Sequence, residues 1–323
     1  MPYTDSMRGA TFRQLQVFAS VARHASFSRA AEELHLTQPA VSMQVRALER
    51  AAGLALFEHV GRKIALTAAG TALLRYANAS ADLLREAKET LDALKGVRIG
   101  TLSLSAVSTA KYFAPSLLAA FTHEYPGVRI RISIGNREEI VRELADNATD
   151  LVIMGRPPRE LETVAEAVAP HPLAIIAAPT HPLARAKRVP LARLTGEPFL
   201  IREEGSGTRA SMERVFGDRD LTFRTAMEVT SNETIKQAVI AGMGLAFISL
   251  HTVGLELQTN KLVVLDVRGL PIVRNWYVIH REGKRLPPSA QAFRAFLLRD
   301  GAGIIERAVG LPPIRPLRRR GLQ

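Results

Sequence analysis

The chain of 323 residues contains no cysteine. Disulfide bonds, zinc sites built on thiolates and cysteine nucleophiles are therefore excluded together. No apolar run is as long as a membrane-spanning helix requires. The first residues, MPYTDSMRGA, also lack the basic-then-apolar order of a signal peptide. These absences predict a cytoplasmic protein without a membrane anchor.

Sequence signatures of catalysis are missing as well. There is no G-x-S-x-G turn, and no H-E-x-x-H or comparable spacing of metal ligands. We therefore expect no enzyme, no catalytic residue, no metal and no cofactor. A metabolite-binding enzyme or a solute-binding protein is a distant alternative.

Basic residues outnumber acidic ones, with 43 lysines and arginines against 31 aspartates and glutamates. The formal net charge is +12, which favours a polyanionic partner, although a generally basic surface is common. Hydrophobic residues make up 47% of the chain, and a length of 323 residues predicts two or more folded units.

The first seventy residues have the apolar spacing of three short helices. The third begins in HLTQPAVSMQV, where Thr37 can cap the helix and Pro39 is tolerated in its first turn. Its inward stripe is Val41, Val45 and Leu48. This order predicts a helix-turn-helix whose third helix can enter a major groove. A small helical bundle with a solvated polar face fits the periodicity equally well.

The next segment, LFEHVGRKIALT, predicts two short strands around Gly61. A hairpin with a basic tip directly after a helix-turn-helix is typical of a wing that contacts phosphate or the minor groove. The order of the parts therefore favours DNA binding. The candidate DNA-contacting residues are Ser28, Thr37, Gln38, Pro39, Ser42, Gln44, Arg46, Arg62 and Lys63.

Residues 67–96 predict one long helix that ends at Gly96, where we expect a hinge. Its seam positions recur at alternating spacings of four and three, as in a heptad repeat. They are Leu73, Ala77, Ser80, Leu84, Ala87, Leu91 and Leu94. The seam predicts pairing with a second chain, and the alternative is that it packs on its own domain.

After Val97 the pattern alternates between strands and helices, which predicts open α/β sheets. Expected strands are 101–107, 128–135, 150–155, 173–179, 198–203, 223–229, 244–249 and 275–283, and expected helices are 109–124, 136–147, 206–218, 232–242 and 289–300. Two such lobes enclose a cleft, and ligands bind beyond the carboxyl ends of the strands.

Several polar residues fall where an expected strand passes into a helix. Free N–H groups and hydroxyls at such places favour an anion, and arginine supplies fixed positive charge. The candidate effector-binding residues are Ser108, Thr109, Asn136, Arg202, Ser206, Thr208, Arg209 and Asn232. Ordinary helix caps would use the same serine, threonine and asparagine residues. GSGTR at 205–209 also lacks the spacing of a Walker loop.

The stretch FSRAAEELHLTQPAVSMQVRALERAAGLALFEHVGRKIALTAAG resembles the amino-terminal domain of LysR-type transcriptional regulators. That resemblance implies a winged helix-turn-helix, a dimerising linker helix and a two-lobed effector domain like periplasmic binding proteins. Many family members have arginine where this chain has Met43. A base contact by arginine is therefore absent at that position, and Arg46 or Gln44 must contribute more.

Longer segments, including IGNREEIVRELADNATDLVIMGRPP and SNETIKQAVIAGMGLAFISLHTV, look like the CbbR subgroup of that family. The subgroup controls the Calvin-cycle operon that encodes RuBisCO. The resemblance implies a phosphorylated metabolite or NADPH as effector, with control of another operon by a different small anion as the alternative. It also implies operator DNA, RNA polymerase and a second or further copies of the chain as partners.

The resulting domain plan has four parts. Residues 1–66 form the winged head, 67–96 the linker helix, 97–300 the effector domain, and 301–323 a basic tail without apolar periodicity that we expect to be disordered. Lobe I takes about 97–169 and 271–300, and lobe II about 170–270.

Overall fold

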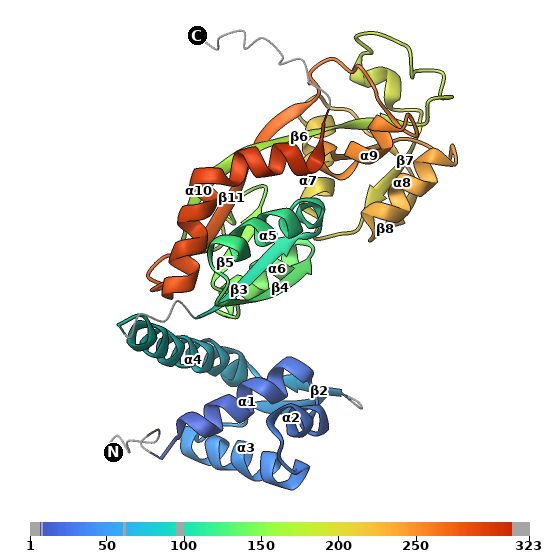
Figure 1. Cartoon of the computed structure of the whole chain (residues 1–323). Coiled ribbons are helices and arrows are strands. Elements are labelled where there is room, and N and C mark those ends of the chain that lie inside the picture. Colours follow the sequence, from blue (N-terminus) through green and yellow to red (C-terminus); the bar gives the residue numbers. More distant parts are fainter. Residues whose placement is uncertain (1–6, 8, 61–62, 95–99, 312–323) are drawn as a thin grey trace. The chain divides into compact units, whose positions relative to one another are not determined.

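The computed structural model describes residues 7, 9–60, 63–94 and 100–311. The chain divides into two compact units. One lies within residues 1–97, together with the short segment 145–148, and the other comprises the remaining residues (Figure 1). No helix among the described residues is long and apolar enough to cross a membrane.

The first unit begins with three helices and a hairpin. They are α1 (Phe12–His24), α2 (Phe27–Leu34), α3 (Gln38–Ala52), β1 (Phe57–Val60) and β2 (Lys63–Leu66). Side-chain caps explain the helix starts, because Thr11, Ser26 and Thr37 each accept a hydrogen bond from a first-turn N–H. The predicted stripe of α3 is buried in the core of this unit.

Helix α4 (Ala68–Leu94) starts beside the hairpin. Thr67 Oγ1 accepts from Gly70 N at 3.0 Å, and a Cβ at Gly70 would lie 2.1 Å from the carbonyl oxygen of Leu56. Glycine is therefore required for this close approach. Leu73 and Ala77, the first two seam positions, pack against the three-helix core.

The later part of α4 presents apolar side chains to solvent. Leu83, Leu84 and Leu91 are 60%, 53% and 58% exposed in the single chain. The first seam positions therefore pack on their own domain, which was the alternative considered from the sequence. The later seam positions are exposed in the single chain. Gly96 lies outside the described residues, and only the backbone of Leu94 is described.

Lobe I of the second unit is built on β3, which pairs in parallel with β4 and β5. Its elements are β3 (Gly100–Val107), α5 (Ala114–Glu124), β4 (Val128–Gly135), α6 (Arg137–Ala145), β5 (Leu151–Met154) and α10 (Pro288–Val309). Lobe II contains β7 (Pro198–Arg202), α7 (Gly207–Gly217), β8 (Arg224–Val229), α8 (Asn232–Ile240), β9 (Ala246–Ser249), α9 (Gly254–Gln258) and β10 (Val263–Val264). The predicted α/β fold class is confirmed.

Two long antiparallel strands join the lobes, β6 (Thr163–Ala177) and β11 (Ile272–Arg281) (Figure 1). Ala169, where we expected the chain to cross into lobe II, lies opposite Trp276 at an irregularity in the register. The expected return near Leu270 falls just before β11.

The carboxyl-terminal helix corrects the domain plan. Helix α10 continues to Val309, and Gly301, Ile305 and Val309 are buried, so residues 301–309 are not a disordered tail. The sequence reading stopped at Asp300 because glycines at 301 and 303 weaken helix propensity. A larger side chain at 301 would meet Val168, which favours glycine at this packing contact. Residues 312–323 lie outside the described residues.

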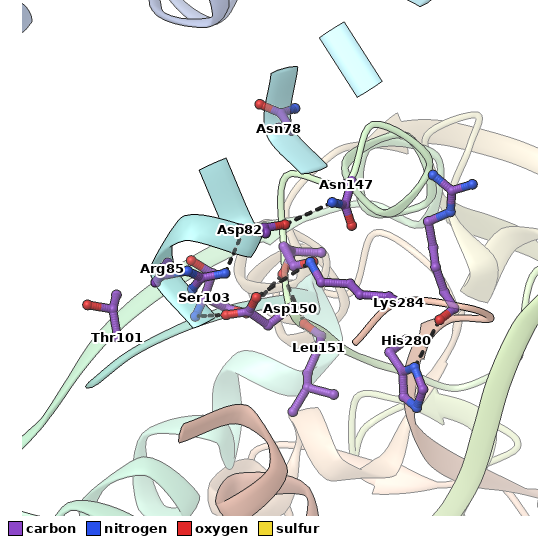
Figure 2. Close-up of polar contacts among 12 residues, drawn as sticks. Asn78, Asp82, Arg85, Thr101, Ser103, Asn147, Asp150, Leu151, His280 and Lys284 are labelled. Atoms are coloured by element: carbon purple, nitrogen blue, oxygen red, sulfur yellow. Dashed lines mark hydrogen bonds and ion pairs between the residues drawn. The ribbon is translucent and has the colours of Figure 1, made fainter. Parts of the chain in front are cut away.

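A buried ion pair fastens the base of lobe I (Figure 2). Asp150 is fully buried, accepts a hydrogen bond from Ser103 N at 2.8 Å and lies 3.5 Å from Lys284 Nζ. Lys284 also donates to the carbonyl of Thr149 at 2.8 Å. These contacts tie β3, the start of β5 and the loop before α10 together.

An aromatic stack fills the space between the lobes. Trp276 is fully buried, stacks on His171 with ring centroids 3.9 Å apart, and donates from Nε1 to His251 Nδ1 at 2.8 Å. Phe113 packs edge-on against both Trp276 and His251. Burial lowers the pKa of His251 to about 4, and burial lowers the pKa of His171 well below its ordinary value.

We expect Asp150→Asn to destabilise the second unit. The substitution leaves Lys284 buried without this carboxylate, and breaking a buried ion pair on one side costs about 3 kcal/mol. Urea unfolding followed by circular dichroism should show this loss. The exposed Asp220→Asn should change the free energy of unfolding by less than about 0.5 kcal/mol. Equal stability of the two variants would contradict the assigned role.

The buried histidines predict sensitivity to acid. Their folded-state pKa values lie below the unfolded value, so stability is lost as pH falls below about 6.5, where only the unfolded chain takes up a proton. For His251 the loss continues to about pH 4 and approaches roughly 3 kcal/mol. Urea unfolding at pH 7, 6 and 5 should give a smaller pH slope for His251→Gln than for the unaltered chain. An identical slope would show that His251 is not buried in its neutral form.

Candidate DNA-binding groove and effector cavity

A groove on the first unit runs between the start of α2, the exposed face of α3 and the hairpin. Its polar and charged lining comes from Ser26, Ser28, Gln38, Ser42, Arg46, Glu49 and His59. Gln38 Nε2 donates to Ser42 Oγ at 3.0 Å, so these two side chains form one polar surface near the start of α3. Arg46 is exposed and has no carboxylate partner within the described part of the chain.

The structure separates the predicted DNA-contacting residues into groups. Ser28, Gln38, Ser42 and Arg46 line the groove. Thr37 acts as the helix cap, with Oγ1 accepting from Ala40 N, and neither Thr37, Pro39 nor Gln44 lines the groove. Pro39 is exposed in the first turn of α3, and Gln44 is half-buried.

The tip of the hairpin lies partly outside the described residues. This applies to Gly61 and Arg62, whereas β2 begins at Lys63, of which only the backbone is described. The sequence reading missed His59 on β1, whose side chain lines the groove. The alternation within FEHV was the available signal, because Phe57 and His59 fall on one face of a short strand.

The second unit contains an inner cavity between its lobes. Lobe I contributes Ser108, Thr109 and Asn136, and lobe II contributes Arg202, Ser206 and Thr208. All six were predicted effector-binding residues. They come together because the ends of β3, β4 and β7 meet at this place, as expected for two α/β lobes.

The cavity is strongly basic. Arg137, Arg156, Arg202 and Arg274 line it, and no aspartate or glutamate is among the described residues of its lining. Ser206 begins α7 without a side-chain capping bond, so its hydroxyl is not used as a cap. Asn136 does act as a cap, because Oδ1 accepts from Glu139 N at 3.0 Å. The arrangement suits an anion that can also accept hydrogen bonds.

Arg202 has internal partners that compete with a ligand. Its guanidinium donates to both carboxylate oxygens of Glu203, at 2.7 and 2.8 Å, and to Asn232 Oδ1 at 2.6 Å. It also donates to Ser108 Oγ across the lobes at 3.2 Å. Arg202 is only 3% exposed, so it organises the cavity wall, and its charge is largely balanced by Glu203.

Two predicted effector residues lie outside the lining of the inner cavity. Asn232 does not line the cavity and instead orients Arg202. Arg209 does not line the inner cavity and pairs with Glu213 at 2.9 Å and Glu228 at 2.7 Å. The local motif GSGTR could not indicate this, because Glu228 approaches from another strand, β8.

Sequence reasoning missed three of the four arginines that line the cavity, Arg137, Arg156 and Arg274. Arg274 on β11 is half-buried, donates to Ser211 Oγ at 2.6 Å, and has no carboxylate partner in the described structure. Burial lowers its pKa, and the charges of Arg214 and Arg156 lower it further. It also lies opposite His171 in the β6–β11 ladder, and both side chains line the cavity. No local motif marks either residue.

In the described part of the chain, no group of three or more histidine, aspartate or glutamate side chains could hold a metal ion. The two sites built by these residues are thus a groove lined by polar and charged side chains and a basic cavity.

Comparison with known proteins identifies the family of both parts of the chain. Residues 12–71 match the model of the bacterial regulatory helix-turn-helix protein of the lysR family, and residues 95–302 match the LysR substrate binding domain. The regulator CfxR of Cupriavidus necator is 52% identical over 304 residues, covering 94% of this chain and 96% of that protein. The RuBisCO operon transcriptional regulator of Allochromatium vinosum is 52% identical over 292 residues, covering 90% of this chain and 97% of that protein.

Solved structures share the fold. The regulatory domain of Synechocystis CcmR, in complex with 2-PG, is 38% identical with a TM-score of 0.60, covering 62% of this chain and 96% of that chain. Full-length OxyR of Pseudomonas aeruginosa, at 20% identity and a TM-score of 0.70, covers 90% of this chain and 98% of that one. The relatives are transcriptional regulators, so the enzyme alternative is set aside. The chain belongs to the LysR family of DNA-binding, effector-responsive and oligomeric transcriptional regulators.

Proposed function

We propose that this LysR-type protein controls a carbon-fixation operon in response to a phosphorylated metabolite or NADPH. The observation that carries the effector class is the inner cavity, with four arginines and no carboxylate among its described lining residues. The name of the Allochromatium vinosum relative, RuBisCO operon transcriptional regulator, supports the operon. The 2-PG complex of CcmR supports a phosphorylated ligand.

The protein acts as a cytoplasmic homo-oligomer in this proposal. The exposed leucines of α4 pair with those of a second chain. This pairing places two DNA-binding domains on a pseudo-palindromic operator. Further association to a tetramer, and contact with RNA polymerase, complete the regulatory assembly.

Effector binding changes the arrangement of the lobes. Ser108 and Arg202 meet across the cavity, and Glu138 N donates to Gly205 O between the lobes at 3.3 Å. An anion bound between such contacts has a higher affinity for one arrangement of the lobes than for the other and stabilises that arrangement. The same difference in free energy then shifts the arrangement of the two DNA-binding domains on the operator.

DNA reading predicts a specific effect of Arg46→Ala. The variant should lose about 1–3 kcal/mol of the preference for operator over random DNA, because a contact to a base edge is removed, whereas loss of a phosphate contact would weaken both duplexes alike. Fluorescence anisotropy with both duplexes measures this preference. Arg75→Ala, which removes an exposed arginine of α4, serves as the control. Unchanged preference in Arg46→Ala would refute the assigned orientation of α3.

Effector recognition predicts a loss in Arg274→Ala. Removing a charge-assisted contact should weaken binding of a phosphorylated ligand about tenfold or more. Isothermal titration of the full-length protein with 2-PG and with NADPH gives the affinity, and operator footprinting with and without each compound gives the regulatory response. Arg224→Ala removes an exposed arginine outside the cavity and should retain both. Failure of every phosphorylated compound to bind the unaltered protein would refute the effector class.

A further inference from the structure

A run of basic residues lies in lobe II, in the segment between β6 and β7 (Figure 1). Residues 181–194 read HPLARAKRVPLARL, with four lysines and arginines and no aspartate or glutamate. The four are Arg185, Lys187, Arg188 and Arg193, and all of them are exposed. None of them lines the inner cavity or the groove of the first unit, so neither site accounts for these charges.

Apolar residues of the same segment anchor it to the core of lobe II. Val189, Leu191 and Leu194 are buried in that core. Leu183 and Ala186 are partly buried and pack against it. The basic residues lie between these anchors along the chain, and their side chains are left at the surface. Packing therefore holds the positive charges in place.

A fifth basic residue comes from a distant part of the sequence. Arg268 Nε donates to the carbonyl oxygen of Arg188 at 2.9 Å, and Arg268 N donates to the carbonyl oxygen of Val189 at 2.9 Å. A parallel bridge between Val189 and Val267 holds the two segments side by side. Arg268 is exposed as well. We call the five exposed residues the basic strip: Arg185, Lys187, Arg188, Arg193 and Arg268.

Acidic side chains do not neutralise the basic strip. Within the described residues, none of its five members forms an ion pair with a carboxylate. Glu197, which follows the segment, lies 3.6 Å from His181 and is engaged there. Asp266 is exposed beside the bridge, and it too forms no ion pair in the part of the chain that the structure describes. Clustered positive charge of this kind attracts a polyanion.

The backbone at Arg188 indicates that its side chain has a partner outside the chain. Its φ is 51°, in the left-handed region that is unfavourable for a residue with a Cβ. Glycine would adopt this φ without strain. The side chain of Arg188 makes no hydrogen bond or ion pair within the described structure. An arginine that the fold does not use, at a position that disfavours it, is typical of a functional surface.

We propose that the basic strip contacts the phosphate backbone of DNA that flanks the operator. The effector domain then supplies a second, sequence-independent DNA-binding surface. Exposed lysine and arginine bind phosphates through contacts that release counterions. DNA is favoured over an acidic protein surface because the winged domain of the same chain already binds a duplex, which raises the local concentration of phosphate. This contact requires neither the proposed effector class nor the carbon-fixation operon.

Two operator duplexes of different length test this contact with the full-length protein. The short duplex carries only the half-sites bound by the paired winged domains, and the long duplex extends on each side by about four helical turns of unrelated sequence. Fluorescence anisotropy over a range of salt concentrations, with excess unrelated duplex in every titration, gives both affinities. The long duplex should bind about tenfold more tightly at low salt. Its salt dependence should be steeper by about 0.9 for each added phosphate contact.

Matched double variants locate the contact. Lys187→Ala with Arg188→Gly should abolish the advantage of the long duplex and leave the affinity for the short duplex within about twofold. Glycine at 188 relieves the left-handed backbone, so the urea midpoint of unfolding should not fall. Arg129→Ala with Arg131→Ala removes two exposed arginines of β4 in lobe I and should retain the advantage. Light scattering checks that both variants keep the oligomeric state of the unaltered protein.

Three results would overturn the contact. Equal affinity and equal salt dependence of the two duplexes would show that flanking DNA is not bound. Equal losses in the two double variants would assign the effect to total charge instead of the basic strip. A Lys187→Ala, Arg188→Gly variant that binds both duplexes normally but fails to support transcription in vitro would assign the strip to an acidic protein surface. The proposed effector class is tested separately and stands or falls independently of these results.

Discussion

The antiparallel pairing of β6 with β11 is the interaction on which the effector domain depends. Each strand passes from one lobe to the other, so their shared ladder determines how the lobes face each other. The register also sets His171 opposite Arg274, and both side chains line the inner cavity. Trp276 fills the space behind them. Residues of the ladder therefore form one part of the cavity lining. The other part comes from the segments that follow β3, β4 and β7, which move with their own lobes.

Charge pairing divides the arginines of this domain into two functional groups. Arg202 and Arg209 belong to the most suggestive sequence motif, yet both are engaged by glutamates. Such residues position backbone and neighbours, since their charge is already compensated and their hydrogen-bond donors are used. Arg274 and Arg156 form no ion pair with a carboxylate in the described structure, although the charge of Glu160 acts on Arg156, and both can donate hydrogen bonds to a bound anion. Sequence proximity to a glycine-rich turn did not separate the two groups.

More features of the winged helix-turn-helix domain than of the effector site could be predicted from the sequence. Thr37, Pro39 and the stripe Val41, Val45 and Leu48 act within one helix, where spacing of 3.6 residues directly sets which side is buried. His59 was missed because its strand has only four residues, and its side chain joins the groove only when the hairpin folds beside α3. Helix α10 was ended too early for a similar reason: Gly301 is unfavourable locally but is favoured by the contact with Val168.

The sequence by itself determined the order of domains, the starts of the three helices of the winged head, the α/β class and the basic character of the ligand sites, whereas α5 begins at Ala114 and not at Thr109. These properties follow from composition, capping and periodicity, which act over a few neighbouring residues. Only the tertiary structure decided which arginines line the cavity and which contacts they make beyond their sequence neighbours, because Asn232, Glu228 and Ser211 reach them from other elements. Glu203 and Glu213 lie near Arg202 and Arg209 in the sequence, but whether a carboxylate or a neutral hydroxyl meets each guanidinium depends on distances in space.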